Sequence, residues 1–296
     1  MSVTNPIKHH YTPRFLLRPF SHEKDYLKYC SKKNFEVCDK KIEEIFMVRN
    51  LYRDEINNID NPTKIEKDLA KFESEISKTV NKFRTGDDVV ITVAEADALK
   101  LFFAIMGFRS KRASGDFSEN ANDEFKEFYS IYQENGDLTD LWKHNLELIV
   151  NCRSIQEVLR NDSIARPIKL FMLRDTEGVT GMHFVVAESR GNEEFIMGDI
   201  LPACMYGRTD NGVELPMYYY IPLSSERVLF LFADGTEVAP EKVVGFRRDF
   251  FKYPKYSKDG KTICHHVSRI YEPDVKKLNE LMCDLSSEGF VFKNKR

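Results

Sequence analysis

The alternation of hydrophobic and polar positions changes its period about half-way along this chain. In the first half, apolar residues recur at steps of three and four, which is typical of helices with one buried face. The clearest case is the stretch 63–83, whose apolar stripe consists of Ile65, Leu69, Phe72, Ile76, Val80 and Phe83. From about residue 182 the period becomes two, which predicts strands. Helices first and strands afterwards predict an α+β fold, with the helical half packed on an antiparallel sheet.

Turn and capping signals divide the two halves into elements. Two S/T-x-x-E capping boxes, Thr63 with Glu66 and Thr92 with Glu95, mark the starts of two helices. A small hairpin is expected over 27–38, and Pro273 suits the first turn of a final helix, which a short strand follows. The other helices are expected over 42–54, 121–134, 138–150 and 154–160. The strands are expected over 182–189, 193–201, 217–223 and 227–233, as an antiparallel meander.

No repeat, low-complexity tract or Pro/Gly/Ser linker separates the halves. The sequence therefore predicts one domain over 1–296, helix-rich over 1–175 and strand-rich with a C-terminal helix over 176–296.

Charge and composition narrow the function classes. The formal net charge is −3, so no global basic field attracts nucleic acid or an anionic membrane. No apolar run approaches the roughly 20 residues that cross a bilayer, and the first ten residues lack a signal-peptide core. The 6 cysteines are widely spaced and form no C-x-x-C. We expect reduced thiols, no membrane partner and a cytoplasmic protein.

Three polar residues lie at the edges of apolar helical stripes. Glu73 is about 40° from Leu69, Asn279 is about 40° from Val275, and Arg109 is about 20° from Phe102. Such side chains should be partly buried and should need partners. One interpretation is a Glu–Arg pair that orients two helices. The other is a cleft wall in which a carboxylate and a guanidinium bind a metal ion or an anion.

A further carboxylate, Asp199, follows strand residues and precedes Pro202. This position suits a metal ligand or a general base, and it equally suits a turn-capping Asp. The pairs His9-His10 and His265-His266 also offer metal ligands. Adjacent residues of an extended chain point to opposite faces, so one imidazole of each pair is the most that one site would use.

The segment 247–261 mixes cations with aromatic rings. It contains six basic and two acidic residues, and its candidate phosphate contacts are Arg247, Arg248 and Lys252. Cations for phosphates and rings for bases are what single-stranded nucleic acid requires. The alternative is a solvated loop whose aromatic side chains pack on the core.

The opening stretch H-Y-x-P-R-F-x-L-x-x-F (His10 to Phe20) resembles the start of a bacterial and phage family known as domain of unknown function 4238. The resemblance continues with E-x-x-L-A-x-x-E (Glu66 to Glu73), the helix that ends at Arg109, the strand-end Asp199 with Pro202, P-L-S (Pro222 to Ser224) and L-N at Leu278 and Asn279. Family members often show S-D-N-P where this chain has G-D-I-L-P. The resemblance implies an accessory protein of bacteria or their mobile elements, in phage defence or a toxin-like role.

Two functional hypotheses follow. In the first, the protein is a metal-assisted phosphodiester hydrolase, a nuclease, that acts on nucleic acid or nucleotides. Its catalytic residues and divalent-metal ligands would be His10, Glu73 and Asp199, and its substrate contacts Arg14, Arg109, Asn279, Arg247, Arg248 and Lys252. In the second, the protein is a non-catalytic sensor or binding module, and the same polar residues form a structural network that fixes the N-terminal segment.

Overall fold

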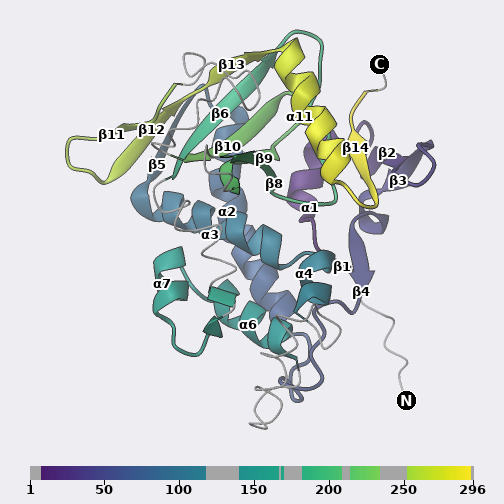
Figure 1. The fold of residues 1–296 in the computed structure, drawn as a ribbon, viewed down its shortest axis with the longest axis vertical. Helices are drawn as coiled ribbons and strands as arrows, with labels where there is room; N and C mark the ends of the chain where they lie inside the picture. The colour runs from purple at the N-terminus through teal and green to yellow at the C-terminus, as the bar shows by residue number, and fades with distance from the viewer. Residues whose placement is uncertain are drawn as a thin grey trace.

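The computed structural model describes residues 8–117, 140–166, 168–169, 182–208, 214–233 and 252–294, and Figure 1 shows their arrangement. The predicted α+β fold is confirmed, because helices dominate the first half and the sheets come mostly from the second. Within these ranges, no helix has both the length and the apolar composition that a membrane crossing requires.

The helices follow the sequence patterns closely. They are α1 (Arg14–Leu17), α2 (Lys64–Thr85), α3 (Val93–Phe108), α4 (Lys111–Asp116), α6 (Leu141–Val150), α7 (Ile155–Arg160) and α11 (Glu272–Leu285). The predictions over 63–83, 138–150, 154–160 and from Pro273 are confirmed, while the helix expected over 121–134 lies outside the described residues.

Only one of the two predicted capping boxes forms. Before α3, the Glu95 amide donates to Thr92 Oγ1 at 3.1 Å, and the Thr92 amide donates to the Glu95 carboxylate at 2.8 Å. Before α2, the Thr63 side chain makes no capping hydrogen bond. The prediction of the Thr63–Glu66 box is therefore wrong. Its motif is present without the backbone geometry that a cap requires: Thr63 has ψ 13°, whereas an N-cap residue is usually extended.

The largest sheet has five strands in the order β13 (Ser268–Tyr271), β6 (Met182–Arg190), β10 (Arg227–Ala233), β9 (Glu214–Pro222) and β8 (Ala203–Arg208). Strands β8, β9 and β10 form an antiparallel meander, but β6 pairs with the far side of β10, and β13 joins β6 in parallel. The predicted meander is thus right in part. The segment 193–201 contributes only β7 (Met197–Gly198), which belongs to another sheet.

Three smaller sheets join segments that are distant in sequence. Their strand orders are β3 (Val37–Lys41), β2 (Tyr26–Ser31), β14 (Gly289–Phe292), β7; β11 (Lys255–Tyr256), β12 (Thr262–His266), β5 (Asp88–Thr92); and β1 (Lys8–His10), β4 (Met47–Arg49). The hairpin over 27–38 and the last strand are confirmed. The helix expected over 42–54 is wrong: a short 3-10 helix, Ile42–Glu44, leads into β4. Pairing with β1 overrides the local helical pattern.

Helices cover both faces of the five-stranded sheet (Figure 1). On one face, Phe83 of α2 and Phe103 of α3 contact Phe184 of β6, with ring centroids 6.4 and 5.6 Å apart. On the other face lies α11, where the Tyr220 hydroxyl donates to the Leu278 carbonyl at 2.6 Å. Buried apolar side chains from Tyr11 to Val291 join in one cluster. The single-domain organisation stays a prediction.

Candidate functional site

The N-terminal segment, residues 8–20, is inserted into the body of the protein. It comprises β1, α1 and a 3-10 turn over Arg18–Phe20. Leu16, Leu17 and Phe20 have no exposed surface, and the Tyr11 amide donates to the Phe46 carbonyl at 3.1 Å. The segment therefore carries His9 and His10 into the interior, whereas the Arg14 side chain stays exposed.

Arg109 connects this segment to two helices. It follows α3 directly, and its residue is 2% exposed. Its Nη1 donates to Glu73 of α2 at 2.5 Å, its Nη2 to the His10 carbonyl at 2.6 Å, and its Nε to the Tyr52 hydroxyl at 3.2 Å. The Tyr52 hydroxyl in turn donates to the Arg109 carbonyl at 3.0 Å. The predicted Glu–Arg pair between two helices is present.

The charge of Arg109 is stabilised by this arrangement. Burial alone would lower the pKa of its guanidinium, but Tyr52 and Glu73 raise the pKa above its ordinary value. A buried cation with acceptors on all three nitrogens is stable where it lies. We call His10, Tyr52, Glu73 and Arg109 the arginine network.

The imidazole of His10 uses both of its nitrogens within the protein. Arg14 Nε donates to His10 Nδ1 at 3.3 Å, so the proton resides on Nε2, which donates to the Ile42 carbonyl at 3.1 Å. Burial, followed by the Arg14 charge, lowers the pKa of His10 to about 4. The ring is neutral near pH 7.

Its neighbour His9 is also buried, and this was not expected from the alternation of an extended strand. The Tyr52 amide donates to His9 Nδ1 at 2.8 Å, and the two rings stack with centroids 5.4 Å apart. Burial, followed by the charge of Arg53, lowers the pKa of His9 to about 4. Both faces of β1 therefore lie against protein.

Glu66 belongs beside the arginine network, although we did not select it from the sequence. It lies seven residues before Glu73 on α2, which places both carboxylates on one face of the helix. The pKa of Glu66 is raised to about 7, mainly by burial; the charges of Arg109 and Arg14 oppose this rise, and the charge of Glu73 adds to it. The E-x-x-L-A-x-x-E motif could have revealed Glu66, because its spacing places the two glutamates on the same face of the helix. No sequence signal pointed to Tyr52, because its segment, 42–54, was expected to be a helix.

Asp199 and Asn279 belong to other sets of contacts. Asp199 accepts the Ser287 amide at 2.9 Å and the Ser287 hydroxyl at 2.5 Å, which fixes the turn between α11 and β14. Asn279 Oδ1 accepts the Ile196 amide at 3.1 Å, and its Nδ2 donates to the Glu194 carbonyl at 2.8 Å. Both residues therefore connect the segment around β7, residues 194–199, to α11 and the turn that follows it. The structure thus gathers His10, Arg14, Glu73 and Arg109, and it leaves Asp199 and Asn279 outside that group.

The basic segment is only partly described. Arg247 and Arg248 lie outside the described residues. Lys252 is exposed, and its amide donates to Ser268 Oγ at 2.8 Å. Tyr253 and Tyr256 are exposed beside it. The nucleic-acid contact assigned to this segment stays a prediction.

His10, Glu73 and Asp199, the proposed metal ligands, all lie in the described part of the chain. There, no three His, Cys, Asp or Glu side chains lie together as a metal ion would need. His10 and Glu73 contact Arg14 and Arg109, whereas Asp199 contacts Ser287. These residues as arranged do not fit one metal centre.

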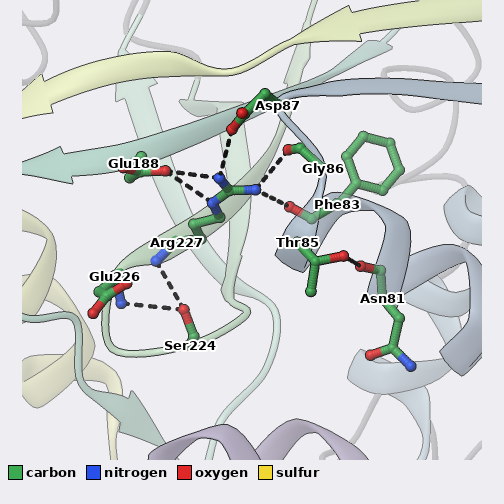
Figure 2. A network of polar contacts seen from close by, with 9 residues as sticks. All are labelled: Asn81, Phe83, Thr85, Gly86, Asp87, Glu188, Ser224, Glu226 and Arg227. Atoms are coloured by element: carbon green, nitrogen blue, oxygen red, sulfur yellow. Dashed lines mark hydrogen bonds and ion pairs between the residues drawn. The ribbon is translucent and has the colours of Figure 1, made fainter.

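A second buried arginine, which sequence analysis missed, binds the C-terminal end of α2 (Figure 2). Arg227 of β10 donates to the Glu188 carboxylate at 3.0 Å through Nε, and to the Gly86 carbonyl at 2.6 Å through Nη1. Its Nη2 lies 3.3 Å from Asp87. A cation at a helix C-terminus satisfies free carbonyls and the helix dipole. Arginines from other elements therefore contact α2 near its middle, through Glu73, and at its C-terminal end.

Comparison with known proteins identifies the family. A family model described as a protein of unknown function (DUF4238) matches residues 8–296. The chain belongs to the DUF4238 family. Searches of the curated proteins and of the solved structures found no match. The polar residues on which the sequence resemblance rested lie at structural contacts: Glu73 and Arg109 in the arginine network, Asp199 on Ser287, and Asn279 on the 194–196 backbone.

Proposed function

We propose that this DUF4238 protein is a non-catalytic binding module, in which the arginine network fixes the N-terminal segment and does not contact substrate. The observation that supports this most directly is the buried Arg109 guanidinium, whose three nitrogens all donate to protein acceptors. A substrate-binding arginine needs free donors and access. The cytoplasmic location and the phage-defence or toxin-like context expected from the sequence belong to this proposal.

A stability measurement on Arg109→Met tests the structural role. Removing one partner of a buried ion pair leaves the other unpaired, which costs about 3–5 kcal/mol. Arg112→Met is the matched control, because the Arg112 side chain is 78% exposed and such substitutions change stability by about 0.5 kcal/mol or less. Urea denaturation of both variants should give a large loss only for Arg109→Met. Equal stability of the two variants would contradict the proposal.

Phosphodiester hydrolysis is the second candidate, and Glu66 is the observation that favours it. A carboxyl group with a pKa of about 7 is suited to general acid–base catalysis, and Arg14 beside it is exposed. Wild-type protein would be incubated with divalent metals and labelled single- and double-stranded DNA and RNA. The binding-module proposal expects no cleavage. Cleavage that His10→Ala, Glu66→Gln or Asp199→Ala abolishes would establish the hydrolase instead.

A further inference from the structure

A cavity of about 180 Å³ lies where three elements meet at one edge of the five-stranded sheet. The end of α3 contributes Phe103 and Gly107, the approach to edge strand β8 contributes Pro202, and β10 contributes Leu231. Arg112 of α4 and Tyr206 of β8 also line it. Asp199 and Arg109 adjoin these lining segments in sequence, and Pro202, which follows Asp199 closely, lines the cavity itself.

The cavity is a space that the surrounding side chains leave open. It opens to solvent at Arg112 and Tyr206, whose side chains are exposed. At Gly107, an added Cβ would meet no atom within 4 Å. A larger residue at this helical position would enter the space and would also favour the helix. Glycine here keeps the cavity open at some expense of helix stability.

The lining indicates the kind of molecule that fits. Apolar and aromatic side chains form most of the surface, and among the described lining residues Arg112 carries the only charge. Its guanidinium is largely exposed, and its ion pair with Asp116 is long, at 3.7 Å. Exposed pairs of this kind contribute little, so the guanidinium can bind another carboxylate. Apolar walls with one or two polar groups are typical of small-molecule sites.

We propose that this cavity binds a small apolar carboxylic acid, with its ring or chain against Pro202 and Leu285, which are partly exposed, and its carboxylate on Arg112. An engineered apolar cavity of about 150 Å³ in another protein binds benzene, so a ligand the size of benzoate matches the volume. This proposal rests on the binding-module function and names its ligand class.

Calorimetric titration of the full chain with benzoate, phenylacetate and hexanoate tests the proposal. At least one of these acids should bind, and benzyl alcohol, which has the same ring without the charge, should bind at least tenfold more weakly. Absence of binding by all three acids at millimolar concentration overturns the proposal. Equal binding of benzyl alcohol overturns the assignment to acids.

Two substitutions with matched controls locate the binding. Gly107→Leu fills the cavity and should reduce the affinity at least tenfold. Gly115→Leu, the same change at an exposed glycine of α4 where a Cβ also meets open space, should leave it unchanged. Arg112→Gln should remove the preference for acids over benzyl alcohol, whereas Arg153→Gln, at an exposed arginine outside the cavity lining, should not. Unchanged affinity in both Gly107→Leu and Arg112→Gln contradicts the proposed site.

A measurement on wild-type protein covers the case in which Gly107→Leu fails to fold. In heteronuclear NMR spectra, benzoate should shift the Gly107 and Arg112 amide signals and leave those of α7 in place. Shifts confined to other regions would overturn the site. These outcomes are independent of the Arg109→Met stability test, so failure of the ligand proposal and failure of the binding-module function are distinguishable.

Discussion

At the scale of single residues, Arg109 explains why polar side chains recur along the apolar stripes of this chain. The guanidinium satisfies a carbonyl of the N-terminal segment, a carboxylate of α2 and the hydroxyl of Tyr52. The His10 carbonyl and the Tyr52 hydroxyl are buried, and a buried polar group that loses a hydrogen-bond partner costs about 1–3 kcal/mol. These directional hydrogen bonds fix the position of the N-terminal segment, residues 8–20, more closely than hydrophobic packing alone would.

The carboxyl group of Glu66 should make stability depend on pH. Its pKa is about 7 in the folded state against 4.5 as the ordinary value, so folding favours the protonated form. Its contribution to stability is therefore greatest below about pH 4.5 and is lost as the pH rises through 7. Glu66→Gln should be more stable than wild type by about 1 kcal/mol at pH 8, and the gain should disappear near pH 5. Urea denaturation across this range measures it.

The buried histidines make stability depend on pH in the opposite direction from Glu66, which provides an internal comparison. His9, His10 and His265 have pKa values lowered from 6.5 to about 4, mainly by burial. They favour the neutral form, so their contribution is complete above pH 6.5 and is lost as the pH falls toward 4. Wild type and Glu66→Gln should share this acid loss. A difference between the two proteins that grew below pH 5 would contradict the assignment to Glu66.

Sequence reasoning could select Glu73 and Arg109 because both lie on clear apolar stripes, where a charge is conspicuous. It could not place Asp199, because the choice between a metal ligand and a turn cap depends on Ser287, which is 88 residues away. Glu66 was overlooked because its role in the supposed capping box of α2 accounted for its carboxylate.

At the scale of elements, the local signals were reliable where tertiary contacts agreed with them. The helices α2, α3, α6, α7 and α11 were predictable from periodicity. The strands β1 and β4 were not, because each has only three residues and exists through its pairing with the other. The segment 193–201 alternates like a strand, but Asp199 turns it toward Ser287 after only two paired residues.

The two capping motifs make a matched test at this scale. Thr92→Ala removes a side chain that caps α3 and should cost about 1 kcal/mol. Thr63→Ala, in a motif of the same spacing, removes a side chain that makes no capping bond to α2 and should cost much less. Thermal unfolding of both variants measures the difference. Equal losses would show that Thr63 caps α2 after all.

At the scale of the whole molecule, the N-terminal segment is part of the core. Leu16, Leu17 and Phe20 contribute to the buried apolar cluster, and β1 pairs with β4. The combination of apolar anchors with His10 and Arg14 made this predictable from the opening motif. The sheet order was not predictable, because the position of β6 beyond β10 depends on long-range pairing.

Deleting residues 1–20 should therefore abolish cooperative folding. The deletion removes several buried side chains and leaves Arg109 without the His10 carbonyl, a loss that exceeds the usual stability of about 5–15 kcal/mol. Circular dichroism during thermal unfolding measures it. Phe20→Ala is the graded companion and should cost about 3–5 kcal/mol. A cooperative transition near that of wild type in the truncated protein would contradict the inserted arrangement.

The most direct test of the arginine network is hydrogen exchange on Arg109→Lys, which keeps the charge and loses the planar set of donors. Amides of residues 9–20 should exchange at least tenfold faster than in wild type, while those of α7 should keep their rates. This result would establish that Arg109 fixes the N-terminal segment. Unchanged exchange over residues 9–20 would contradict that central claim.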